Sequence, residues 1–228
     1  MTINIPQKAE QILRTLNEAG YEAYVVGGCV RDSILNRVPG DWDITTSALP
    51  EQVKALFHRT VDTGIQHGTV TVMMGKEGFE VTTYRVDGEY HDGRHPDAVT
   101  FTRSLEEDLK RRDFTINAMA YHPEHGLVDL FGGMEDINRK IIRCVGDPVE
   151  RFTEDALRML RAVRFSAQLG FTVEENTKAA LARMSGNLGA CQCRAYPDRA
   201  CKASGIRSSG LPPDSLGDRP YPGISSGI

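Results

Sequence analysis

Two aspartates flank a tryptophan in the run GDWDITT (40–46), and their spacing suits metal binding. Side chains alternate across a β-strand, so Asp41 and Asp43 would share one face while Trp42 faces the core. Two neighbouring carboxylates repel each other unless a cation lies between them, and oxygen ligands favour Mg²⁺. A solvated strand end would explain the same residues, so the choice between a metal site and a strand end depends on the neighbouring segments.

A glycine pair upstream, in VVGGCVRDSIL (25–35), fits close approach of a phosphate group. Gly27 and Gly28 follow a β-branched run and precede a short helical segment, so backbone N–H groups at the helix start can contact phosphate oxygens. Arg31 adds a permanent positive charge. The alternative is a tight turn with Arg31 and Asp32 as a surface ion pair. Beside the aspartate pair, however, a phosphate site suits a metal that bridges a triphosphate.

Later segments supply a third carboxylate and another cation. In GFEVTTYR, Glu80 would share a strand face with Thr82 and Tyr84, and it could complete a three-carboxylate cluster that holds two metals. An ordinary outward-facing glutamate is the alternative. In RRDFTINAMA, Arg112 is a candidate contact to a phosphate or a ribose.

The segment EDALRMLRAVRF predicts a helix with a polar stripe that can read a base. The stripe consists of Asp155, Arg158, Arg161 and Arg164, three residues apart. A carboxylate accepts hydrogen bonds and a guanidinium donates them, so Asp155 beside Arg158 complements cytosine and adenine. Uracil and guanine would leave buried groups unmatched, at about 1–3 kcal/mol each. The alternative is an ion pair on a solvated helix, worth about 0.5 kcal/mol.

The pattern of apolar residues around these segments predicts an α+β fold, a mixed sheet with helices. Strands are expected over 21–28, 42–46 and 97–102, and as a hairpin of 67–75 with 78–85. Helices are expected over 6–19, 30–36, 49–57, most of 104–120, 152–171 and 172–184. Thr172 is predicted to cap the last of these, with Glu175 completing a capping box.

The bulk properties narrow the possible partners. The net charge of −4 means that a nucleic acid would have to meet a local positive patch. No apolar run is long enough to cross a membrane and the N-terminus lacks a signal-peptide pattern, so we expect a cytoplasmic protein without membrane contact. An odd count of five cysteines without a C-x-x-C pair argues against a disulfide framework and a zinc knuckle.

The end of the chain differs in composition from the rest. Residues 187–228 contain no glutamate and no phenylalanine, but three of the five cysteines and five of the eleven prolines. They show neither strand nor helix periodicity. We therefore expect an aberrant, disordered tail, which a shift of reading frame on a truncated gene would produce.

Together, the runs GGCVRD, GDWDITT, EVTTYR, RRDFTINAMA, DLFGG and EDALRMLRAVRF resemble the bacterial class II tRNA nucleotidyltransferase and poly(A) polymerase family. The resemblance is strongest to its CCA-adding members and covers about residues 22–185. It implies a polymerase-β-like nucleotidyltransferase head followed by the start of an all-α neck. We place the head at 1–146, the partial neck at 147–186 and the tail at 187–228.

The resemblance also implies a reaction and its residues. The resemblance to the CCA-adding members implies addition of C and A from CTP and ATP to the 3′ end of tRNA, without a template, by a two-metal mechanism with Mg²⁺. Asp41, Asp43 and Glu80 would be the catalytic carboxylates, with the two aspartates binding metal. The nucleotide contacts would be Gly27, Gly28, Arg31, Arg112, Asp155, Arg158, Arg161 and Arg164. The segment DGEYHDGRHPD would be the family's mobile loop; the alternative for its His91 and His95 is a zinc site.

Three other functions fit parts of the pattern. A poly(A) polymerase, or an enzyme that adds only part of CCA, shares these motifs. A catalytically inactive fragment could still bind nucleotide or RNA. A nucleotide-sugar transferase also uses an Asp-x-Asp pair, but the glycine pair and the Asp155/Arg158 stripe argue against it.

Overall fold

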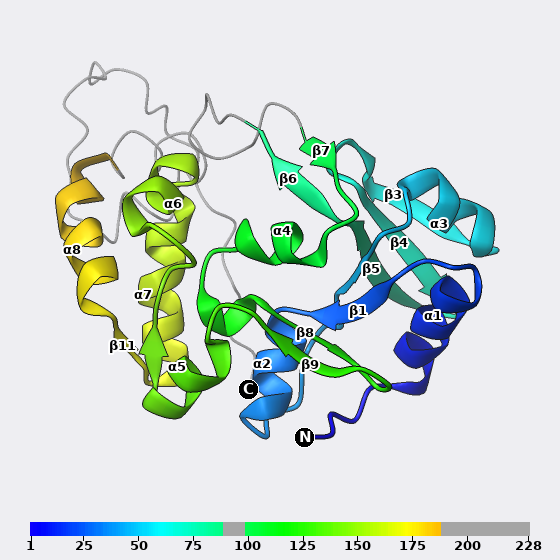
Figure 1. Cartoon of the computed structure of the whole chain (residues 1–228), viewed down its shortest axis with the longest axis horizontal. Helices are drawn as coiled ribbons and strands as arrows, with labels where there is room; N and C mark the ends of the chain where they lie inside the picture. The colour runs from blue at the N-terminus through cyan, green and yellow to red at the C-terminus, as the bar shows by residue number, and fades with distance from the viewer. Residues whose placement is uncertain (89–98, 188–228) are drawn as a thin grey trace, which may run out of the picture. The chain divides into compact units, whose positions relative to one another are not determined.

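Within residues 1–88 and 99–187, the part of the chain that the structure describes, seven strands form one mixed sheet. This computed structural model confirms the predicted α+β class (Figure 1). Strands β2 and β5 are parallel, and the other neighbours are antiparallel. In spatial order the strands are β3 (Thr60–Gly64), β4 (Thr69–Met74), β5 (Glu77–Thr83), β2 (Ile44–Thr46), β1 (Ala23–Val26), β8 (Met119–His122) and β9 (Gly126–Asp129).

Helices α1 (Gln7–Glu18) and α3 (Pro50–Leu56) pack on this sheet and on each other. Both follow the predicted pattern: α1 begins after Pro6 and α3 begins at Pro50, where a missing N–H is tolerated. The face of α1 that carries Ile12, Leu13 and Leu16 is at most 1% exposed. Burying each of these side chains contributes about 1.5–3 kcal/mol. Since α1 contacts β1 and β2, this packing fixes the strands that carry the candidate site.

The remaining helices contact the sheet, the short strand pairs or one another. Helix α2 (Gly28–Ile34) contacts β1 and β8, and α4 (Leu105–Lys110) contacts β6 (Arg85–Asp87), which pairs with β7 (Val99–Phe101). Helix α5 (Gly133–Arg139) is followed by α6 (Pro148–Glu154), α7 (Leu157–Leu169) and α8 (Glu175–Met184), and these last three lie together in Figure 1. Short 3₁₀ turns cover Ile65–His67, Thr115–Asn117 and Ser185–Asn187.

A short parallel pair crosses the predicted boundary between head and neck. Strand β10 (Ile141–Ile142) precedes residue 147 and pairs with β11 (Thr172–Val173), which follows it. All the described residues fall within one compact unit, Met1–Leu188. The division at 146/147 stays a prediction. Residues 89–98, with His91 and His95, and the tail from 188 onward lie outside the described residues.

The predicted helix over 152–171 is wrong in one respect, because the structure divides it into α6 and α7. Asp155 has an extended backbone (φ −138°, ψ 105°), and its Oδ1 accepts a hydrogen bond from the N–H of Leu157 at 2.8 Å. An aspartate side chain that satisfies a backbone donor in this way competes with helix continuation. Asp155 therefore precedes α7 and is not part of a helical stripe.

Two other predicted helices have different limits in the structure. The segment 104–120 is helical only to Lys110, and its apolar end, Met119 onward, belongs to the buried strand β8. Short apolar runs do not distinguish a buried strand from a buried helix. Helix α8 begins at Glu175 and is capped by Glu174, whose carboxylate accepts from the N–H of Thr177 at 2.8 Å, whereas Thr172 pairs in β11.

The predicted core position of Trp42 is also wrong. Strand β2 begins only at Ile44, which is 1% exposed and is the first core residue of this segment. Trp42 precedes the strand and is partly exposed. Strand alternation, on which the prediction relied, does not extend back to residue 42.

Among the described residues, no helix is long and apolar enough to cross a membrane.

Candidate active site

The register of the sheet brings Asp43 and Glu80 onto adjacent strands. Strands β2 and β5 pair in parallel with Ile44 opposite Val81, so the residue before each pair, Asp43 and Glu80, is also adjacent. The carbonyl of Asp43 accepts a hydrogen bond from the N–H of Val26 at 3.0 Å, which fixes this position against β1. The predicted neighbourhood of these two carboxylates follows from parallel pairing, which the sequence pattern did not reveal.

Electrostatic effects show that the three carboxylates share one region. Burial raises the pKa of Asp43, and the negative charges of Glu80 and Asp41 raise it further, while the Arg112 guanidinium acts in the opposite direction. Asp43 is exposed when the whole residue is considered, but it lines a cavity in which surrounding protein atoms displace part of the water. The carboxylates offer only oxygen donors and repel one another, so this cluster fits a hard divalent cation.

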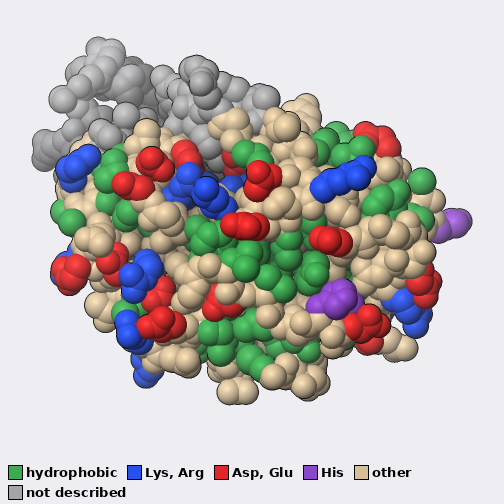
Figure 2. Space-filling model, in the orientation of Figure 1, with side chains coloured by type: hydrophobic (Ala, Val, Ile, Leu, Met, Phe, Trp, Pro, Cys, Tyr) green, Lys and Arg blue, Asp and Glu red, His purple; other side chains and the backbone are tan. Residues whose placement is uncertain are grey.

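A cavity of about 490 Å³ lies beside Asp43. Figure 2 shows basic side chains gathered between α4 and α6, with acidic side chains around them. The cavity is lined by Gly27, Gly28, Arg31, Asp43, Arg111, Arg112, Asp113, Asn117, Asp155, Leu157, Arg158, Arg161 and Phe165. Its lining therefore includes most of the predicted nucleotide contacts, drawn from segments far apart in the sequence.

Gly27 lets a guanidinium approach the backbone at the edge of this cavity. Its φ of +81° and ψ of −127° are unfavourable for any residue with a side chain. A Cβ at Gly27 would lie 3.3 Å from Nη1 of Arg112. The N–H of Gly27 bonds to the carbonyl of Met119 at 3.1 Å, which fixes the turn before α2. A glycine is therefore required here both by the backbone conformation and by the position of Arg112.

Arg31 and Arg161 are held by one hydrogen-bonded network. Nη1 of Arg31 donates to Oδ1 of Asn117 at 2.6 Å, and the same guanidinium bonds to Asp32. The amide of Asn117 donates to Asp113 at 3.3 Å, and Nε of Arg161 donates to the other Asp113 oxygen at 2.6 Å. Two predicted cations are thus tied together through a buried aspartate and a buried asparagine.

Asp108 fixes Arg112 and its neighbour Arg111. Its fully buried carboxylate accepts from Nε and Nη2 of Arg111 at 3.0 and 2.8 Å, and from Nη2 of Arg112 at 3.2 Å. Burial by itself would raise the pKa of Asp108, but the Arg112 and Arg111 guanidiniums outweigh it and hold the pKa below its ordinary value. Among the described residues, the buried Nε of Arg112 has no hydrogen-bond partner, so this guanidinium keeps a donor for another group.

Asp155 and Arg158 are the two residues predicted to select the base, and that role stays a prediction. Both Asp155 and Arg158 line the cavity. The carboxylate of Glu154 accepts from Nη1 of Arg158 at 2.7 Å, and Nη2 of Arg158 donates to the carbonyl of Arg111 at 3.2 Å. These bonds orient a guanidinium that is only 7% exposed.

Arg164 does not line the cavity, and a phenylalanine that the sequence reasoning missed does. The guanidinium carbons of Arg31, Arg161 and Arg164 lie 5.1, 5.2 and 5.1 Å from the centre of the Phe165 ring. These distances allow cation–π attraction. Phe165 directly follows the predicted stripe, but a single aromatic residue on an amphipathic helix gives no signal beyond core packing.

Comparison with known proteins shows the family of this chain. Residues 23–143, more than half of the chain, match the family described as the poly A polymerase head domain. The chain belongs to this family. The polymerase-β-like class predicted from the sequence is confirmed.

Several relatives are similar over most of this chain. The CCA-adding enzyme of Leuconostoc mesenteroides is 58% identical over 187 residues, covering 81% of this chain and 47% of the relative. That of Lactobacillus helveticus is 59% identical over 174 residues, covering 76% and 44%. The Bacillus stearothermophilus CCA-adding enzyme in complex with CTP has 50% identity and a TM-score of 0.74, with 81% of this chain and 44% of that chain covered. The chain thus spans less than half the length of these relatives.

Proposed function

We propose that this chain carries the catalytic head of a CCA-adding enzyme, which transfers C and A from CTP and ATP to the 3′ end of tRNA. The observation that supports this best is the shared cavity, which Asp43, Arg158 and Arg161 all line. The similar enzymes support the same activity, since one solved relative holds CTP and another holds a primer tRNA and an ATP analogue. The cytoplasmic location stays a prediction.

In this proposal Asp41, Asp43 and Glu80 hold Mg²⁺. Their mutual repulsion, visible in the raised pKa of Asp43, is relieved by a divalent cation. When bound, magnesium supplies positive charge that lowers the pKa of an attacking hydroxyl and neutralises charge on the leaving group.

The residues of the chain itself position the nucleotide. Arg112 and Arg31 lie on either side of the Gly27–Gly28 turn, and they would bind triphosphate oxygens. Held there, the α-phosphate faces the carboxylates, where the tRNA 3′ oxygen attacks phosphorus and the bond to the pyrophosphate oxygen breaks. One phosphodiester bond forms, the hydroxyl proton passes to water, and pyrophosphate leaves with the electron pair of the broken P–O bond.

Asp155 and Arg158 would select the base. One N–H of Arg158 Nη2 donates to the carbonyl of Arg111, and its second N–H, together with the Nε–H, can donate to a base. N3 and O2 of cytosine, or N1 of adenine, can accept these hydrogen bonds. The carboxylate of Asp155 would accept from the exocyclic amino group. Because Arg158 is held by Glu154 and by backbone carbonyls, its orientation is set before a nucleotide enters.

The test is incorporation by the full chain. A tRNA that lacks its 3′-terminal CCA is incubated with Mg²⁺ and each labelled nucleoside triphosphate in turn. We expect C followed by A, and we expect Asp43→Asn to abolish both, while Asp62→Asn on the exposed strand β3 changes neither. Addition of A alone would indicate a poly(A) polymerase or a partial CCA-adding enzyme, and no addition of any nucleotide would indicate an inactive fragment.

A further inference from the structure

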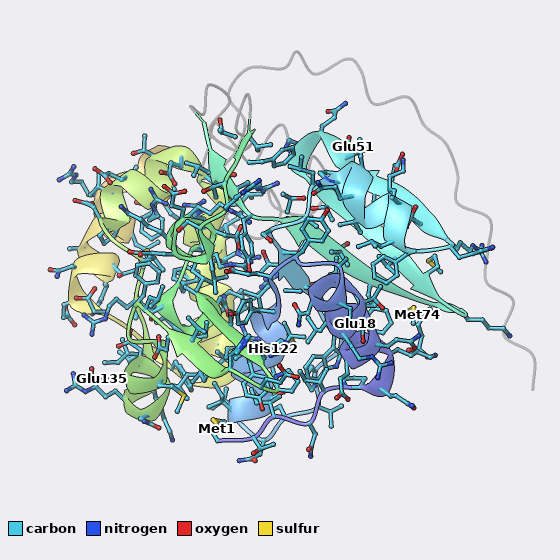
Figure 3. The ribbon with its side chains drawn as sticks, turned by 45° about the vertical axis from the view of Figure 1, so that its right-hand side comes forward. Met1, Glu18, Glu51, Met74, His122 and Glu135 are labelled. Atoms are coloured by element: carbon cyan, nitrogen blue, oxygen red, sulfur yellow. The ribbon has the colours of Figure 1, made fainter. Side chains whose placement is uncertain are left out.

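The turn between β8 and β9 gathers three side chains suited to a transition metal, away from the nucleotide cavity. His122 ends β8, and Glu124 and His125 lie in the turn that leads to Gly126 of β9. One ligand atom from each of the three lies within 4.8 Å of the others. Figure 3 labels His122 beside the ribbon of β8. None of the three lines the cavity that holds Asp43.

We propose that His122, Glu124 and His125 bind a zinc-type divalent cation. Two imidazoles with one carboxylate are a ligand set that Zn²⁺ accepts, with water as a fourth ligand. Neighbouring ligand atoms around a tetrahedral zinc lie about 3.3 Å apart, a separation that follows from Zn–ligand bonds of about 2 Å. Glu124 and His125 are exposed, so rotation of their side chains can close the remaining gap.

The buried ring of His122 is already oriented as a metal ligand would be. Its Nδ1 accepts a hydrogen bond from the N–H of Glu124 at 3.1 Å, so Nε2 carries the proton. Nδ2 of Asn17, at the end of α1, lies 2.8 Å from Nε2, and with this amide turned by 180° its oxygen takes that place and accepts the proton. Metal-binding histidines usually have such a partner on the second nitrogen. We therefore assign Nδ1 as the ligand atom, with the main-chain bond of Glu124 replaced by the metal.

The second imidazole is placed beside the first. The rings of His122 and His125 stack with centroids 4.6 Å apart, and the Tyr24 hydroxyl lies 3.4 Å from Nδ1 of His125. Donation from Nδ1 to that hydroxyl leaves Nε2 of His125 as an acceptor for the cation.

A bound cation would join the β8–β9 turn to α1 through Asn17, and would thus be structural. The test is a Zn²⁺ titration of the full chain in excess Mg²⁺, followed through the histidine ring signals by NMR. Ring signals report on each histidine separately, so zinc bound by cysteines elsewhere in the chain does not confuse the result. We expect the His122 and His125 signals to shift together and to saturate at the same zinc concentration.

Three variants and a control sharpen the test. His125→Ala and Glu124→Gln should weaken the zinc affinity measured from the His122 signal, the first by at least about tenfold. Asn17→Ala should weaken this affinity by about tenfold. His58→Ala removes an exposed histidine elsewhere and should have no effect. Circular dichroism checks that each variant is folded. An unshifted His122 signal, or one that shifts equally in His125→Ala, would overturn the proposal.

Discussion

Replacing Asp108 by asparagine removes a buried negative charge on which two arginines of the cavity depend. Besides Arg111 and Arg112, the carboxylate accepts from the hydroxyl of Thr45 at 3.1 Å and the N–H of Arg85 at 3.4 Å. Removing one partner from a buried ion pair destabilises a protein by about 3–5 kcal/mol. Arg111 and Arg112 keep 16% and 19% of their side-chain surface exposed, so water compensates them in part. We therefore expect about 3 kcal/mol, at the lower end of that range.

The effect of pH follows from the direction of the pKa shift. The folded pKa of Asp108 lies below its ordinary value of 3.8, so the folded state binds protons less readily than the unfolded state. The stability that this carboxylate contributes is present above its ordinary pKa and is lost as pH falls through the lowered folded pKa. Asp108→Asn should therefore be less stable than the wild type at neutral pH, and the difference should shrink on acidification.

Urea unfolding followed by circular dichroism measures the loss at each pH. Asp136→Asn is the matched control, because Asp136 is also buried and pairs with Arg143 and Thr115 but does not line the cavity. Both variants should lose stability, but only Asp108→Asn should also weaken CTP binding, by about tenfold, since Arg112 loses its anchor. A loss below about 1 kcal/mol, or equal CTP binding by the two variants, would refute this account of Asp108.

Three other substitutions test the cavity. Gly27→Ala should lower the free energy of unfolding by about 1–3 kcal/mol because of its positive φ, and it should weaken CTP binding by displacing Arg112. The control Gly20→Ala, also at positive φ but with open space around it, should only reduce stability. Equal CTP affinities of the two variants would contradict this. Phe165→Leu should weaken CTP binding several-fold in equilibrium dialysis, and Phe165→Tyr, which keeps the ring, should not; similar losses would exclude a cation–π role. Asp155→Ala should reduce the preference for CTP over UTP by about tenfold in the same assay, and an unchanged preference would remove Asp155 from base selection.

Local chemistry made much of this molecule predictable from its sequence. Pro6 and Pro50 mark helix starts, and the hairpin of β4 and β5 follows from two alternating runs around a short turn. Gly27 was assigned either to a tight turn or to close approach of a phosphate; its positive φ is what such a turn requires, and the phosphate contact stays a prediction. In each case the feature depends on residues that are close together in the sequence, such as a proline or a glycine whose own backbone preference sets the local conformation.

Predictions that depended on long-range contacts were less successful. The strand at Met119 depends on pairing with β1 and β9. The break at Asp155 is a local exception, since it depends on one side-chain hydrogen bond to the N–H of Leu157. The roles of Asp108 and Phe165 appear only when segments from α4, α2 and α7 come together. Whether Asp41, Asp43 and Glu80 bind metal, and whether Arg164 contacts a nucleotide, stay predictions.

The central claim is that the cavity beside Asp43 holds CTP or ATP in preference to the other nucleotides. Equilibrium dialysis of the full chain with each labelled nucleoside triphosphate in Mg²⁺ tests it directly. We predict that CTP and ATP bind about tenfold or more tightly than UTP and GTP, because mismatched bases leave buried polar groups unpaired. Equal binding of all four, or no binding of any, would contradict the account.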